Sequence, residues 1–185
     1  MELTAVKPSK GFEAFSNEFL LNVYAQGPER LRKAVRGLSE DELTVFPFKD
    51  KWSIKEISFH LLDSELVGTI RFRQTLMQSD THFPFYNQDI WTKQLEHQQK
   101  NIYELQEALA MFKLLRTSNT RLLQAVKADQ WELKGFHPEK GELTLRQLLE
   151  IYADHSERHI DQILARRRLF GNPVELPVIL NKRLY

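Results

Sequence analysis

The chain has 185 residues, of which 42% are hydrophobic and 28% are charged, and its formal net charge is +1 at pH 7. A chain of this length can bury one well-formed core and is short for two ordinary domains, so we expect a single domain over residues 1–185. Basic residues are spread along the chain, which argues against nucleic acid as a partner. No cysteine is present, so disulfides, thiolate metal ligands and a cysteine nucleophile are excluded.

Several other classes of protein are disfavoured by what the sequence lacks. The first residues have no apolar signal-peptide core, and no apolar run approaches membrane-spanning length. We therefore expect a cytoplasmic protein without a membrane partner. No glycine-flanked serine elbow is present, and the seven scattered glycines supply no phosphate-binding loop.

The N-terminal part predicts a helical arm over residues 12–38. Apolar residues recur at steps of three and four over residues 12–25, which is typical of an amphipathic helix. Gly27 and Pro28 are expected to stop that helix, and Pro28 suits the first position of a second one. The arm should therefore be broken or kinked at this point.

A long helix is predicted from about Ile54 to Met77. The stretch Ser53-Ile54-Lys55-Glu56 has the form of a capping box, in which the serine and the glutamate satisfy each other's backbone amides. Gly68 costs about 1 kcal/mol relative to alanine in mid-helix, which indicates that a neighbouring helix approaches closely there.

The middle of the chain is expected to alternate connectors and helices. Residues 79–88 form an aromatic loop, residues 89–96 a short helix, and residues 102–126 a third long helix. Residues 135–141 are expected to be a turn-rich connector, and residues 174–185 a tail. No alternating strand pattern is found.

The last long helix is predicted from Thr144, which opens a second capping box with Gln147, to about Phe170, where Gly171 stops it. Four helical arms with connectors of moderate length predict an all-α fold, a four-helix bundle.

This last helix carries His155 and His159, four residues apart, so both imidazoles point the same way and can reach one ion. They interrupt an apolar stripe that includes Tyr152 and Ile163. A histidine spacing of four also arises by chance, so the pair alone is weak evidence for a metal. Its placement strengthens the case, because a buried imidazole needs a metal or a hydrogen bond to offset its desolvation.

His60, beside the apolar stripe of the helix at residues 54–77, is the expected third ligand. Three neutral imidazoles hold one divalent metal ion and leave a position open for water or substrate, as in catalytic sites. Imidazole suits zinc, nickel, iron or copper, so ligand type alone does not identify the metal. Asp63 shares the helical face of His60 and is the candidate base or orienting carboxylate, although a solvated surface carboxylate is an equal alternative.

Other histidines and a few aromatic and acidic residues are less direct candidates for the site. His82, His97 and His137 are expected to be surface groups, with His137 kept as a candidate wall of the site. Tyr86, Asp89 and Trp91 could line an entrance, although an aromatic packing cluster is the favoured interpretation.

The segment from Trp52 to Glu65, which contains His60 and Asp63, resembles the DinB-like superfamily and its YfiT-like branch, together with Phe136-His137-Pro138 and the segment from Thr144 to Ile163. The resemblance extends over roughly residues 31–173. It implies a four-helix bundle with nickel or zinc on a triad that maps onto His60, His155 and His159, and it implies a homodimer. Relatives are described as metal-dependent hydrolases, and others in the superfamily use bacillithiol or mycothiol.

Three functions remain open at this stage. The favoured hypothesis is an enzyme in which the metal binds a small thiol as thiolate for attack on an electrophilic small molecule, as in a bacillithiol-type S-transferase. The second is a hydrolase that activates water, with Asp63 or a connector residue as the base. The third is a protein that binds metal or a small ligand without turnover.

Overall fold

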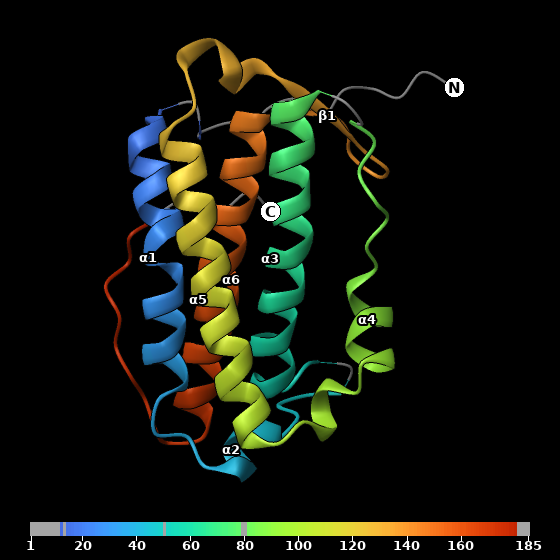
Figure 1. Cartoon of the computed structure of the whole chain (residues 1–185). Helices are drawn as coiled ribbons and strands as arrows, with labels where there is room; N and C mark the ends of the chain where they lie inside the picture. Colours follow the sequence, from blue (N-terminus) through green and yellow to red (C-terminus); the bar gives the residue numbers. More distant parts are fainter. Residues whose placement is uncertain (1–11, 13, 50, 79–80, 181–185) are drawn as a thin grey trace.

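The computed structural model describes residues 12, 14–49, 51–78 and 81–180, and its long helices form a four-helix bundle (Figure 1). These are α1 (Asn17–Val35), α3 (Ile54–Met77), α5 (Ile102–Gln124) and α6 (Leu145–Leu169). The shorter elements are α2 (Glu40–Thr44), α4 (Gln88–Gln94), the 3-10 turns η1 (His97–Gln99) and η2 (Ala128–Glu132), and the strands β1 (Lys134–His137) and β2 (Gly141–Thr144). The predicted four-helix bundle is confirmed.

The long helices are connected in an order that places parallel helices side by side. Helices α1 and α3 each pack against both α5 and α6. Arg146, at the start of α6, donates to the carbonyl of Phe15 just ahead of α1, and Arg167, near the end of α6, donates to the carbonyl of Ala34 near the end of α1. Helices α1 and α6 therefore run in the same direction, as do α3 and α5 (Figure 1).

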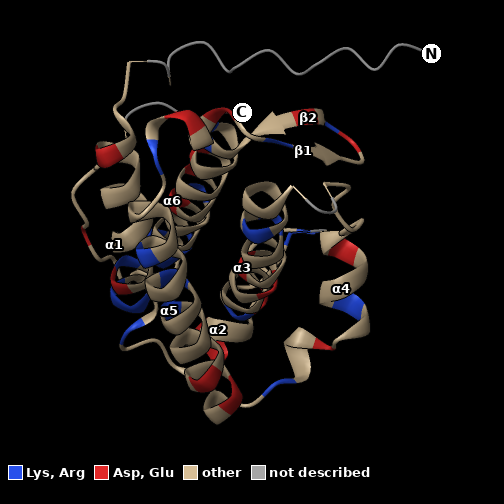
Figure 2. Ribbon diagram, turned by 45° about the horizontal axis from the view of Figure 1, so that its top comes forward, with Lys and Arg blue, Asp and Glu red and all other residues tan. Residues whose placement is uncertain are grey.

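Parallel neighbours cannot be joined by a tight turn, so the chain needs a long crossover, residues 78–101, between α3 and α5. This crossover carries α4 and η1, and both contact α3. Seen from nearer the bundle end, α4 stands outside the four helices on the side of α3, and charges of both signs are mixed over the molecule (Figure 2). The crossover thus places an extra layer of side chains over one face of α3.

The predicted break at Pro28 is wrong, because α1 continues through it. Proline has no N–H to donate to the carbonyl four residues earlier, which is that of Tyr24. Arg116 of α5 supplies the missing donor, since its Nη1 lies 2.9 Å from that carbonyl oxygen. Gly27 makes room for it, because a Cβ there would lie 2.9 Å from the same Nη1.

The start of α1 also differs from the prediction. The helix begins at Asn17 rather than near residue 12, because the Ser16 hydroxyl accepts from the Phe19 amide and caps it. Phe12 lies ahead of the helix and is nevertheless buried. An apolar residue at helical spacing can therefore reach the core from a non-helical segment.

Both capping boxes predicted from the sequence are present. Ser53 caps α3 with Glu56, and Thr144 caps α6 with Gln147. Helix α3 ends at Met77, as predicted, and α6 ends at Leu169, one residue before Phe170. The two helices that carry the histidines therefore start where their local sequence dictates.

The turn-rich connector at residues 135–141 contains strands that were not predicted, because β1 and β2 form an antiparallel hairpin around its turn. Each strand has four residues, too short for an alternating pattern to be visible in the sequence. The amide of Phe83, in the crossover, donates to the carbonyl of Phe136 on β1. The hairpin therefore holds the crossover beside the end of α3.

The interior contains a buried polar network as well as two apolar clusters. Arg116 donates from Nε to Glu65 at 2.6 Å and from Nη2 to the carbonyl of Tyr152 at 2.9 Å. Asn119 donates to the other oxygen of Glu65 at 2.8 Å, and the Tyr24 hydroxyl donates to the same oxygen. This network links all four long helices. None of the described helices is long and apolar enough to cross a membrane.

Candidate metal centre

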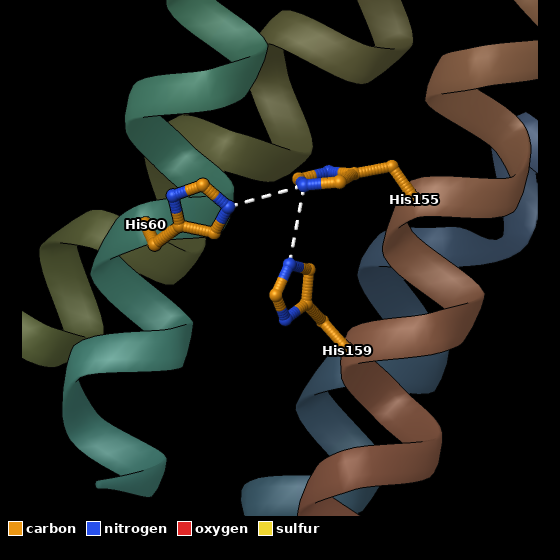
Figure 3. A group of neighbouring side chains, drawn as sticks. All are labelled: His60, His155 and His159. Carbon is orange, nitrogen blue, oxygen red and sulfur yellow. Dashed lines mark hydrogen bonds between the residues drawn. The ribbon is translucent and has the colours of Figure 1, made fainter. Parts of the chain in front are cut away.

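His60 on α3 faces His155 and His159 on α6, and the three rings point toward one another (Figure 3). Nε2 of His155 lies 3.1 Å from Nε2 of His60 and 3.1 Å from Nε2 of His159. One nitrogen from each of the three side chains lies within 4.8 Å of the other two. The structure thus brings together the three histidines singled out in the sequence.

The donor set fits a divalent cation. Two nitrogens bound to one tetrahedral zinc at about 2.1 Å lie about 3.4 Å apart, so a small movement of each ring would accommodate the ion. The Nδ1 atoms of two histidines face away from this point and have partners of their own. Nδ1 of His60 lies 3.0 Å from the Tyr86 hydroxyl, and Nδ1 of His159 lies 3.1 Å from Oε1 of Gln162.

These outer partners orient the rings. Gln162 Oε1 can only accept, so it keeps a proton on Nδ1 of His159 and leaves the Nε2 lone pair available for a metal. The Tyr86 hydroxyl can accept from Nδ1 of His60 in the same way. Because burial raises the pKa of Tyr86, its hydroxyl stays protonated at neutral pH.

The histidines are held in the neutral form that metal binding requires. Burial is the largest cause that lowers the pKa of His60 and of His155 well below the ordinary value, and neighbouring histidines lower it further. Burial also lowers the pKa of His159 to about 4. All three imidazoles are therefore neutral at pH 7, which is the form that can bind a metal.

Aromatic side chains pack around the triad. The ring of Trp52, just before α3, lies 4.7 Å from the ring of His60 and 6.2 Å from that of His159, measured between centroids. Tyr86 stacks at 6.2 Å from His60 and makes an edge contact with Trp91 at 5.0 Å. The predicted aromatic cluster of the crossover therefore exists, and Tyr86 also contacts the site.

Two hollows reach different members of the triad. One, of about 370 Å³, is lined by His60 and His155. The other, of about 570 Å³, is lined by His159. Gln88 and Asp89, at the start of α4, line both hollows. The triad thus borders two spaces large enough for small molecules.

Asp63 lies away from both hollows, against His97. Its Oδ2 is 3.1 Å from Nε2 of His97, and neither residue lines either hollow. His97 is buried, at 2% exposure, so its assignment to the surface is wrong. The 3-10 turn η1 and α3 pack together and enclose it beside Phe59, whose ring stacks on it at 5.2 Å. The catalytic role expected for Asp63 stays a prediction.

His137 is also buried rather than on the surface, and it lines the smaller hollow. Its position on strand β1 explains the difference, because the hairpin folds it inward. His82 is exposed, as expected. Three contributors to the site and its surroundings were missed in the sequence: Trp52, Gln162 and Arg71, the last of which lines the smaller hollow. Only Gln162 had a local signal, since it follows His159 by three residues on the same helical face.

A four-helix bundle with three histidines facing each other from two of its helices defines the class of this protein: a helical-bundle protein with a candidate divalent-metal site. The chain belongs to the DinB superfamily, whose family model matches residues 24–163. The resemblance noted in the sequence is thereby confirmed.

Relatives with similar sequences carry names that refer to a metal. The chain is 26% identical over 167 residues to the protein named "Putative metal-dependent hydrolase YfiT" of Bacillus subtilis, covering 89% of this chain and 92% of that one. It is 25% identical over 142 residues to a Bacillus cereus protein named "Putative metal-dependent hydrolase", covering 76% of this chain and 79% of that one.

The fold also matches a solved structure of YfiT from Bacillus subtilis, described as having an unusual four-helix bundle topology. The TM-score is 0.79 with 25% identity, and the match covers 90% of this chain and 94% of that one. The names of the relatives and the histidine triad together indicate a divalent metal, and they make an enzyme plausible.

Proposed function

We propose that this protein is a divalent-metal-dependent enzyme for small molecules and that it transfers a small thiol of the bacillithiol type to an electrophile. One observation favours a transfer reaction. The two hollows contact different members of the triad, since one is lined by His60 and His155 and the other by His159. A thiol in one hollow and an electrophile in the other would meet at the three imidazoles.

The charge of the triad and the residues that orient its rings suit this reaction. Neutral His60, His155 and His159 add no negative charge, so a divalent cation bound to them keeps its full charge and favours the thiolate form of a thiol. Tyr86 and Gln162 fix the orientation of the His60 and His159 rings through contacts with the Nδ1 atoms of those rings. We propose zinc or nickel, one ion per chain, because imidazole ligands suit both.

The second candidate is hydrolysis, and the names of the relatives favour it. Asp89 lines both hollows and is exposed, so it is a carboxylate that water at the triad could reach. Asp63 remains the base proposed from the sequence. The variant Asp63→Asn tests this role. Loss of turnover with the metal retained would support Asp63 as the base, and unchanged turnover would exclude it. A protein that binds its ligand without turnover is the third candidate.

The deciding experiment measures thiol binding to protein purified without a histidine tag. Elemental analysis first establishes which metal is present and at what stoichiometry. Titration with a panel of small thiols follows, with and without a chelator. Saturable thiol binding that disappears on chelation supports the transferase. Indifference to thiols together with turnover of an ester or amide would support the hydrolase instead.

The expected partners are a small molecule and a second copy of the chain. We propose a small-molecule substrate rather than nucleic acid, and a homodimer, which the family resemblance implies. Light scattering of the purified protein measures the oligomeric state directly, and a monomeric mass at micromolar concentration would contradict the homodimer.

A further inference from the structure

Arg71 is a buried cation in the wall of the smaller hollow. It lies on α3, about three turns or 16 Å further along the helix than His60, and so on nearly the same helical face. The residue is 6% exposed. It lines the same hollow as His60 and His155. A small molecule in this hollow would thus contact Arg71 at one end and the triad at the other.

The guanidinium of Arg71 uses only part of its hydrogen-bonding capacity. Nη1 donates to the hydroxyl of Tyr152 at 3.2 Å, and Nη2 lies 3.4 Å from the carbonyl of Pro84. Nε is buried and has no hydrogen-bond partner within the described part of the chain. A guanidinium has five N–H groups, so three of them remain unused.

The other buried arginines of the described residues differ from Arg71 in this respect. Arg30 and Arg116 are paired with glutamates. Arg166 and Arg167 donate from every guanidinium nitrogen to backbone carbonyls or an amide oxygen. Arg71 makes no ion pair with any described carboxylate, and its Nε is the buried arginine nitrogen left without a partner.

A buried charge without a counter-ion is costly unless something compensates for it. The ring of Phe83, 5.6 Å from the guanidinium carbon, offers only a weak contact. Two carboxylates, Asp89 and Glu139, line the hollow, but both are exposed, so water screens them. The compensation that fits the geometry is an anionic group of a bound ligand.

His137 adds a neutral donor to the same wall. Its Nδ1 accepts from the backbone amides of Glu139 and Lys140, at 3.1 and 3.3 Å. The proton of the neutral ring is therefore on Nε2. Because burial lowers the pKa of His137 to about 4, the ring is neutral at pH 7. The wall thus offers a fixed cation and a hydrogen-bond donor.

We propose that Arg71 recognises a carboxylate on the small molecule that occupies this hollow, with the reacting end of that molecule at the histidine triad. The planar guanidinium suits a carboxylate because it can donate two parallel hydrogen bonds. Carboxylate binding itself does not require the metal. The position of the reacting end rests on the proposed function.

The test compares a carboxylate with its neutral amide. Titration calorimetry of the metal-loaded protein would use 6-mercaptohexanoate and 6-mercaptohexanamide, which carry a thiol at one end and a carboxylate or its neutral amide at the other. We expect the acid to bind about tenfold or more tightly than the amide, as for a charge-assisted pair. In Arg71→Gln the two should bind equally, and Arg71→Lys should retain part of the preference. Arg168→Gln, an equal loss of charge at an exposed site, should leave it unchanged.

A second titration separates this inference from the proposed function. Hexanoate and hexanamide, which have no thiol, would be compared on chelator-treated protein. A preference for hexanoate that depends on Arg71 would support the inference even if thiol binding at the triad fails. Equal affinities for acid and amide in the wild-type protein would overturn the inference, whatever the thiol experiment gives. A preference that persists in Arg71→Gln would overturn it as well.

Discussion

Gly68 of α3 lies directly against the ring of Tyr152 on α6, so that a Cβ at position 68 would be 2.7 Å from two ring carbons. This contact confirms the close approach of helices predicted from the mid-helix glycine. The same contact also affects the smaller hollow, because the hydroxyl of Tyr152 accepts a hydrogen bond from Arg71. The spacing of two helices thus fixes a side chain in the wall of the candidate site.

Gly68→Ala should therefore destabilise the protein despite the better helix propensity of alanine. Alanine gains about 1 kcal/mol over glycine in a helix, whereas overpacking costs about 1–3 kcal/mol. We expect a net loss in the free energy of unfolding, measured by urea denaturation. Thr117→Ala, at an exposed position of α5, gains propensity without the clash and serves as the control. A stability gain in Gly68→Ala equal to that of the control would contradict the close contact.

Replacing any of His60, His155 and His159 by alanine should abolish stoichiometric metal, because two imidazoles hold a divalent ion much less tightly than three. Elemental analysis of untagged protein measures the metal content. His82→Ala removes an exposed histidine and should keep full occupancy. Full occupancy in one of the triad variants would mean that its histidine is not a ligand.

Tyr86→Phe should weaken metal binding without unfolding the protein. The variant removes the hydroxyl that lies 3.0 Å from Nδ1 of His60, and loss of such an outer partner costs about 10–100-fold in metal affinity. Competition with a chromophoric chelator measures this affinity. Tyr103→Phe, at a residue 74% exposed on α5, is the matched control. Equal affinities in the two variants would show that Tyr86 does not orient the ligand.

Acid should destabilise the metal-free protein through histidines that are partly or fully buried. The pKa of His159 and of His137 is lowered to about 4 in the folded protein, against about 6.5 in the unfolded chain. Between these values the unfolded chain binds more protons, so stability is fully present above pH 6.5 and decreases as the pH falls toward 4. Urea midpoints between pH 8 and pH 5 measure the effect, and His137→Gln should reduce the slope below pH 6.5. An unchanged slope in that variant would contradict the neutral assignment.

Glu65→Gln should strongly destabilise the bundle. It keeps the shape of the side chain and removes the negative charge that compensates buried Arg116 at 2.6 Å. Breaking a buried pair by removing one partner costs about 3–5 kcal/mol. Urea denaturation measures the loss, and Glu107→Gln at an exposed position of α5 should change stability by about 0.5 kcal/mol or less. A small loss in Glu65→Gln would show that Arg116 is compensated in another way.

Local sequence signals determined the long helices that carry the histidines. The capping boxes at Ser53 and Thr144 and the periodicity behind them placed the start of α3 and of α6 correctly. Such signals depend on residues three or four positions apart, which contact one another whatever the rest of the chain does. The spacing of His155 and His159 belongs to the same category, since one helix suffices to bring their side chains together.

Tertiary structure alone decided the features that depend on residues far apart in the chain. Pro28 does not end α1, because Arg116 of another helix supplies the donor that proline lacks. The position of His60 opposite His155 depends on which helices are neighbours in the bundle. The incomplete pairing of Arg71 depends on the packing of α3, α6 and the crossover together. The sequence thus determined which side chains could form a metal site, and the packing of the helices decided how they meet and what surrounds them.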